Sequence, residues 1–73
     1  MRPKTLDSSY LQSLQYSDAA KVLRVRLSDG AVIDYRGVSS RTYNAILAAK
    51  SHGEAFIRLV KDKYDFTIVK QAA

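Results

Sequence analysis

Residues 21–36, which read KVLRVRLSDGAVIDYR, decide the fold of this chain. Apolar side chains alternate with charged or small ones on both sides of the tripeptide SDG at 28–30, a pattern typical of two strands joined by a turn. A two-residue Asp29-Gly30 loop would mix apolar and charged residues on each face, whereas a three-residue loop keeps them apart. The sequence therefore predicts a β-hairpin with loop 28–30 and with Gly30 in the left-handed conformation.

This register gives the hairpin two chemically different faces. Apolar side chains pair on one face, among them Val25 with Ile33 and Leu23 with Tyr35. The other face carries Val22, Arg24, Arg26, Val32, Asp34 and Arg36. Arg24 lies opposite Asp34 and can pair with it. Arg26 and Arg36 have no obvious partner on the sheet. We therefore expect a basic, water-exposed sheet face.

Two further segments alternate in the same way, one near each end of the chain. Residues 10–16 place Leu14 and Tyr16 on one face and predict a first strand. The last predicted strand covers residues 64–68, with three side chains facing inward: Tyr64, Phe66 and Ile68. Both strands are expected to join the hairpin in one sheet.

Two short helices are expected between the hairpin and the last strand. Ser39 or Ser40 is a suitable cap for the first, whose apolar stripe contains Tyr43, Ile46 and Leu47. Ser51 followed by Glu54 has the capping-box pattern that opens the second helix. The buried side of that second helix is predicted to contain Ala55, Phe56, Leu59 and Val60.

The predicted fold class is α+β: a small antiparallel sheet, made of the central hairpin plus N- and C-terminal strands, with two short helices on one face. Residues 1–8 are interpreted as an irregular basic arm, residues 9–70 as a single domain and residues 71–73 as a frayed tail. A chain of 73 residues is expected to build only one core.

The composition argues against several classes of function. There is no cysteine, the carboxylates are spread singly along the chain, and His52 is the only histidine. We therefore expect no catalytic residues, no metal, no cofactor and no small-molecule substrate, and we interpret His52 as an exposed linker residue. No apolar run approaches the roughly 20 residues of a membrane span, so no membrane partner is expected.

The basic residues are the strongest functional signal. Twelve Lys and Arg against seven Asp and Glu give a net charge of +5, which favours polyanionic partners. Guanidinium groups fit phosphate or carboxylate bidentately, so their clustering on a rigid sheet favours recognition. The predicted partner-binding residues are Arg2 and Lys4 on the arm, Tyr10 as a surface anchor, and Arg24, Arg26 and Arg36 on the sheet. The alternative interpretation is a solvated face that only protects an open sheet.

A set of short motifs from about Ser9 to Val69 resembles the KTSC domain family. They are Ser9-Tyr10, Tyr16-Ser17, Asp29-Gly30, Tyr35, Gly37-Val38-Ser39, Tyr43, Ala49-Lys50-Ser51-His52-Gly53, Phe56, Arg58 and Tyr64. The chain departs from the family's Tyr-x-Tyr motif at Ile33, which replaces the first tyrosine. The family consists of short domains found alone in bacteria and phages and at the C-terminus of some lysyl-tRNA synthetases, and the resemblance implies RNA binding.

The length and the basic start are also similar to those of a phage-encoded regulator of host RNA polymerase. This resemblance implies a partner site beside the RNA exit channel, on the polymerase β′ N-terminal region and the β flap. It further implies inhibition of host promoter initiation and antitermination at intrinsic terminators. We accordingly expect a monomer in the cytoplasm of the infected bacterial host, bound to the β′ and β subunits near nascent RNA. The alternative function is a free-standing RNA-binding module of the KTSC type.

Overall fold

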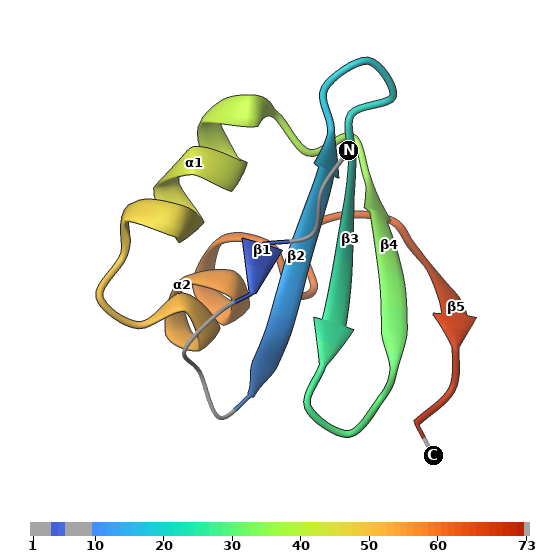
Figure 1. Ribbon diagram of the computed structural model, residues 1–73. Helices are drawn as coiled ribbons and strands as arrows, with labels where there is room; N and C mark the ends of the chain where they lie inside the picture. The colour runs from blue at the N-terminus through green and yellow to red at the C-terminus, as the bar shows by residue number, and fades with distance from the viewer. Residues whose placement is uncertain (1–3, 6–9, 73) are drawn as a thin grey trace.

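The computed structural model describes residues 4–5 and 10–72. A five-stranded antiparallel sheet has the order β1-β2-β3-β4-β5, and Figure 1 shows both helices on one side of it. The strands are β1 (Lys4–Thr5), β2 (Leu11–Ser17), β3 (Val22–Leu27), β4 (Val32–Arg36) and β5 (Phe66–Lys70), and the helices are α1 (Ser40–Ala48) and α2 (His52–Leu59). The predicted α+β fold, with helices on one face, is confirmed.

The β3–β4 hairpin has the predicted register. Val25 pairs with Ile33 and Leu23 pairs with Tyr35. The backbone N–H of Leu27 donates to the carbonyl oxygen of Ala31 (2.8 Å), which closes a loop over residues 28–30. Gly30 has a φ of 97°, the left-handed conformation that glycine adopts without steric cost. The apolar side of the hairpin consequently faces the helices.

The loose alternation of β2 has a structural cause. The register shifts between Leu11 and Ser13, so Gln12 is an extra residue that forms a bulge against β3. Because of this bulge, Leu11 and Leu14 both point into the core although they are three residues apart, and both are fully buried.

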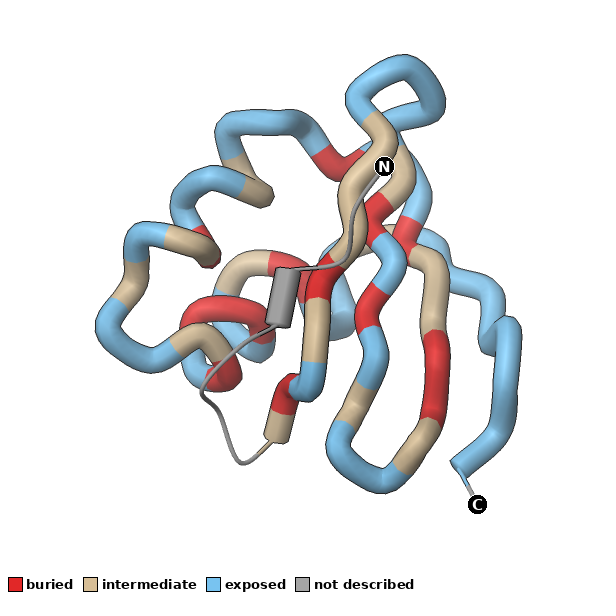
Figure 2. Tube along the Cα trace, in the orientation of Figure 1, coloured by how far each residue is buried: buried red, intermediate tan, exposed pale blue. Residues whose placement is uncertain are grey.

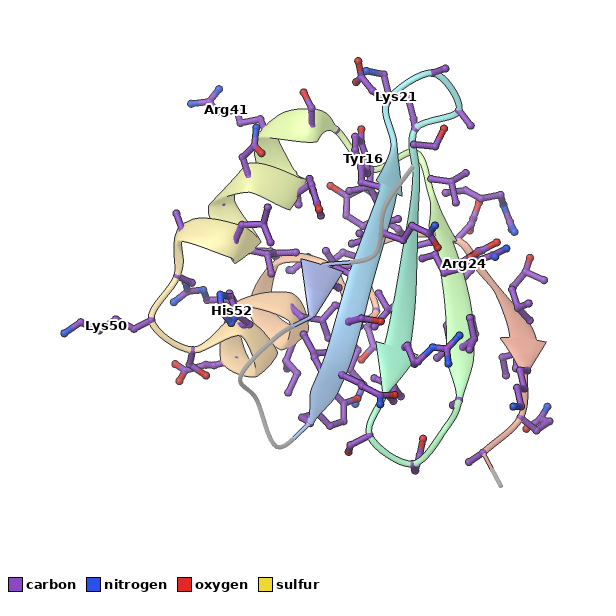
Figure 3. All side chains as sticks on the ribbon, viewed as in Figure 1. Tyr16, Lys21, Arg24, Arg41, Lys50 and His52 are labelled. Carbon is purple, nitrogen blue, oxygen red and sulfur yellow. The ribbon has the colours of Figure 1, made fainter. Side chains whose placement is uncertain are left out.

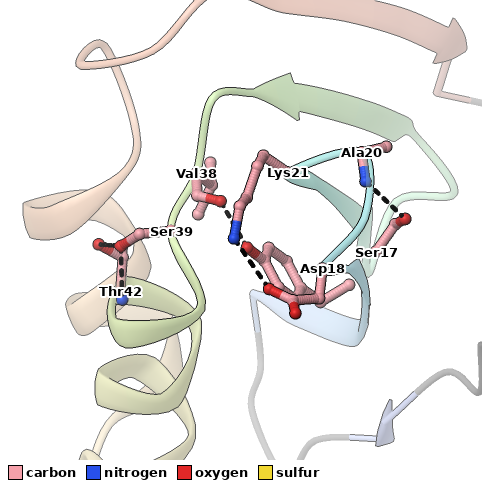
Figure 4. Close-up of polar contacts among 8 residues, drawn as sticks. Ser17, Asp18, Ala20, Lys21, Val38, Ser39 and Thr42 are labelled. Carbon is pink, nitrogen blue, oxygen red and sulfur yellow. Dashed lines mark hydrogen bonds and ion pairs between the residues drawn. The ribbon is translucent and has the colours of Figure 1, made fainter.

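Serine caps begin both helices. The backbone N–H of Thr42 donates to Ser39 Oγ (3.2 Å), so Ser39 is the cap of α1 (Figure 4). The N–H of Glu54 donates to Ser51 Oγ (3.2 Å), which confirms the predicted cap of α2. These caps satisfy backbone donors that have no partner inside a helix.

The core lies between the sheet and the helices, where the buried segments of Figure 2 face one another. Its fully buried large side chains are Phe56, Leu11, Leu14, Leu23, Ile46, Val25, Val38 and Val60. Tyr16 stacks on Tyr43 with ring centroids 4.9 Å apart, and its hydroxyl donates to the carbonyl oxygen of Val38 (2.6 Å). As predicted, Tyr16, Tyr35, Tyr43 and Tyr64 all pack in or against the core.

Three predicted details need correction. Lys4 and Thr5 are not irregular but form β1, which pairs with Leu14 and Ser13 of β2; the other residues of the predicted arm lie outside the described part of the chain. His52 is not an exposed linker residue: it is half-buried at the start of α2 and its Nε2 donates to the carbonyl oxygen of Leu47 (3.2 Å).

The third correction concerns β5. Phe66 and Ile68 lie opposite Tyr35 and Ile33, on the side of the sheet that the helices cover, as predicted. They are nevertheless 51% and 47% exposed, because β5 lies at the edge of the sheet away from the helices (Figures 1 and 2).

No helix among the described residues is long and apolar enough to cross a membrane.

Candidate functional site

The sheet face opposite the helices, called the outer face below, contains the predicted arginine cluster. Cross-strand pairing arranges its side chains in three rows. Two rows run across four strands, Ser13-Arg26-Val32-Lys70 and Gln15-Arg24-Asp34-Thr67, and a third contains Ser17, Val22 and Arg36. Strands in a sheet lie about 4.8 Å apart and alternate residues about 6.8 Å apart, so this face holds its cations in a fixed two-dimensional pattern.

An ion pair occupies the centre of the outer face. Arg24 donates from Nε to Asp34 Oδ1 (2.7 Å) and from Nη2 to Asp34 Oδ2 (3.0 Å), a bidentate contact (Figure 3 labels Arg24). The hydrogen bond with the carboxylate, followed by its charge, raises the pKa of Arg24 above its ordinary value. The pair therefore cancels its own charge and holds the Arg24 guanidinium against Asp34 of the neighbouring strand.

No carboxylate of the described residues neutralises the other two predicted arginines, Arg26 and Arg36. The side chain of Arg26 is exposed and makes no hydrogen bond or ion pair within the described residues. Arg36 is also exposed, and its Nη1 donates to the neutral hydroxyl of Thr67. Neither cation lies beneath the helices or against a carboxylate of the described chain. Both are consequently available to an anionic partner.

Lys70 is a further cation of this face that the sequence did not predict. Simple alternation along β5 would place it on the same side as Phe66 and Ile68. The register instead shifts between Val32 and Ile33, so Val69 is an extra residue and Lys70 lies opposite Val32 on the outer face. Within the paired residues of β3, β4 and β5, the face thus carries four cations and one carboxylate, a net charge of +3. Just before β5, the exposed Asp65 lies opposite Arg36, whose backbone N–H donates to its carbonyl oxygen.

Val32 shows how the free cations are positioned. It lies on the outer face but is only 5% exposed, and it does not belong to the cluster of core residues beneath the helices. Its cross-strand neighbours are Arg26 and Lys70. We infer that the aliphatic stems of these two side chains cover Val32 while their charged ends reach solvent. In this interpretation, packing on Val32 positions the two cations.

Of the three remaining predicted site residues, only Tyr10 has a described side chain, and it does not lie on the outer face. Arg2 lies outside the described residues, and Lys4 is placed only by its backbone, which pairs with Leu14 in β1. Tyr10 is half-buried and packs against the core, with its ring centroid 6.2 Å from that of Phe56. The structure thus groups Arg24, Arg26 and Arg36 and leaves Tyr10 on the helix side.

A cleft between the two helices also contains charged residues. An open cleft of about 200 Å³ at the junction of α1 and α2 is lined by Ala49, Lys50, Ser51, Glu54, Ala55 and Arg58. Figure 3 shows that Lys50 points away from the body of the protein. No group of three His, Cys, Asp or Glu side chains among the described residues is arranged to hold a metal ion. The outer face is the better candidate site, because it gathers four cations on neighbouring strands.

Fold and site together define a small α+β domain with a rigid basic sheet face. The chain belongs to the KTSC domain family, whose model matches residues 7–64. It is 34% identical over 64 residues to an uncharacterized protein of Stutzerimonas stutzeri (strain A1501), covering 88% of this chain and 90% of that protein. A crystal structure of a KTSC domain protein from Yersinia pestis has the same fold, with a TM-score of 0.88 at 23% identity over 94% of this chain and 97% of the other.

Proposed function

We propose that this protein is a phage transcription regulator that docks on the RNA polymerase of its bacterial host, near the RNA exit channel. The observation that carries the proposal is the outer face, with +3 net charge on a rigid sheet and with Arg26 unneutralised at its surface. Such a face favours an acidic protein surface or a phosphate backbone over a neutral partner. The similarity of length and basic start to a phage regulator favours the polymerase β′ N-terminal region and the β flap.

The mechanism that follows is steric and electrostatic. A compact body beside the exit channel leaves less room for the RNA hairpin of an intrinsic terminator, so the polymerase reads through. The same body hinders promoter initiation where it displaces contacts of the specificity factor. Arg2 and Lys4 bring two more positive charges near the start of the chain and extend the contact in this proposal.

Purified bacterial RNA polymerase, both as the core enzyme and with its specificity factor, provides the test. The protein is expected to co-purify with it, to inhibit transcription from promoters and to increase readthrough of an intrinsic terminator. The double variant Arg26→Glu and Arg36→Glu should weaken binding at least tenfold. Its matched control, Lys61→Glu and Lys63→Glu, makes the same charge change at exposed positions between α2 and β5 and should weaken binding far less. Equal loss in both variants, or no binding by the natural chain, would refute the proposal.

An RNA-binding module is the second candidate, because the same cations also fit phosphate. The outer face has no aromatic side chain among the described residues on which a base could stack, which favours the polymerase. Three unneutralised charges predict a slope of log affinity against log salt of about −2 for single-stranded RNA. Gel shifts over a salt series measure it. A slope near that value, without polymerase binding, would establish the RNA module instead.

A further inference from the structure

Strand β5 is an open edge of the sheet. It is last in the strand order and pairs only with β4 within the described residues. The N–H of Arg36 donates to the carbonyl oxygen of Asp65 (2.9 Å), so Arg36 and Asp65 are a hydrogen-bonded pair. This pair determines which residues of β5 bond to β4. Because antiparallel residues bond alternately to either side, Thr67 bonds toward β4 whereas Phe66 and Ile68 direct their backbone groups toward the open edge. These groups are a template for another strand.

The two sides of this edge differ in chemistry. On the helix side, Phe66 and Ile68 are about half exposed, and the ring of Phe66 continues the core by contacting Tyr35 with centroids 5.8 Å apart. On the outer side, Lys70 is exposed and Arg36 is bonded to Thr67. A strand added here would therefore alternate between apolar contacts on the helix side and cationic ones on the outer side.

We propose that the β5 edge binds an extended segment of alternating apolar and acidic residues, which adds to the sheet as a sixth strand. Main-chain hydrogen bonds to Phe66 and Ile68 supply affinity, and the alternation supplies specificity. The apolar residues of the segment cover Phe66 and Ile68, while its carboxylates face Lys70 and Arg36.

Charge decides between this partner and a second copy of the chain. Each copy carries +5, and pairing through β5 would bring two such surfaces together. An acidic segment instead neutralises the cations beside the edge. The inference rests on the proposed docking function, because it describes how an acidic segment of the partner would bind. It can nevertheless be tested without the polymerase.

Amide hydrogen exchange of the full chain tests the strand addition directly. The probe is a synthetic octapeptide of alternating valine and glutamate, and its control has the same composition with all valines before all glutamates. The alternating peptide should slow exchange at Phe66 and Ile68 at least tenfold, while Thr67 is slow with or without it. Unchanged exchange at Phe66 and Ile68, or equal protection by the control peptide, would overturn the inference.

A matched pair of variants tests the same edge in the polymerase complex. Ile68 on β5 and Ile57 on α2 are 47% and 48% exposed, so Ile68→Asp and Ile57→Asp change charge and apolar surface alike. Only Ile68→Asp should weaken peptide and polymerase binding at least tenfold.

If the natural chain binds polymerase and Ile68→Asp binds equally well, the edge inference fails and the proposed function stands. If the peptide protects β5 but polymerase is not bound, the edge inference stands and the proposed function fails. If the natural chain sediments as a dimer and Ile68→Asp sediments as a monomer, a second copy of the chain occupies the edge.

Discussion

Replacing Asp34 by asparagine should destabilise the protein slightly and strengthen its binding to an anionic partner. The carboxylate neutralises Arg24 at the centre of the outer face, and the two side chains are 22% and 44% exposed. A partly exposed cross-strand ion pair stabilises a fold by about 0.2 to 1 kcal/mol. In a domain of this size that corresponds to a fall in Tm of about 1 to 8 °C.

The same substitution raises the net charge of the outer face by one unit. A freed guanidinium about 4 Å from a partner's carboxylate or phosphate contributes about 1 kcal/mol in a water-like dielectric. This is an increase in affinity of about fivefold, which should disappear near 1 M salt, where the screening length is only about 3 Å. Thermal unfolding followed by circular dichroism, and titration against purified core polymerase at two salt concentrations, measure both effects.

Asp18→Asn is the matched control for Asp34→Asn. It also removes a carboxylate that pairs with a cation, Lys21 (3.0 Å), but in the turn between β2 and β3 (Figure 4). The total charge changes equally, so Asp18→Asn should raise affinity by less than twofold. An Asp34→Asn protein that binds no better than Asp18→Asn would refute the assignment of the outer face as the binding surface.

Three further substitutions test how the fold is held together. Tyr16→Phe removes the hydrogen bond to the Val38 carbonyl but keeps the ring, so unfolding free energy should fall by about 1 kcal/mol, which a urea titration measures. Ser51→Ala removes the acceptor for the Glu54 N–H and should lower Tm by about 4 to 8 °C in a thermal melt. Burial, and then the nearby Tyr10 and Asp62, raise the pKa of Tyr35 above 10.0 in the folded protein. The folded state thus holds this proton more tightly than the unfolded state, so stability falls as pH rises above about 10, and Tyr35→Phe should make unfolding less sensitive to pH in that range.

Much of the hairpin could be predicted because two independent constraints agree there. Alternation alone allows more than one loop length, but only the three-residue loop separates the arginines from the aliphatic side chains and uses Gly30 at a positive φ. The ion pair between Arg24 and Asp34 follows from that register. The position of the cluster was therefore encoded locally, within sixteen consecutive residues.

What could not be predicted depends on contacts between distant segments. A bulge is set by hydrogen bonding across strands and not by composition, so the sequence did not show that Val69 shifts Lys70 to the outer face. Alternation also identifies the side of the sheet on which Phe66 lies but not how far the helices extend over it. A strand of two residues such as β1 is too short to have a period at all.

The chemistry of the outer face and the stability of the fold are only weakly coupled, which makes the proposals separable from unfolding. The core consists of side chains on the helix side, and none of the cations of the outer face belongs to it. The exception is Val32, which we infer to be shielded by the stems of Arg26 and Lys70. Glutamine or glutamate at position 26 keeps part of that aliphatic stem while removing the positive charge, whereas alanine would also uncover Val32. If Arg26→Gln and Arg26→Glu lose binding without a change in Tm, the charge of Arg26 is what the partner recognises. If only Arg26→Ala loses binding, the packing of the Arg26 stem on Val32 is what matters.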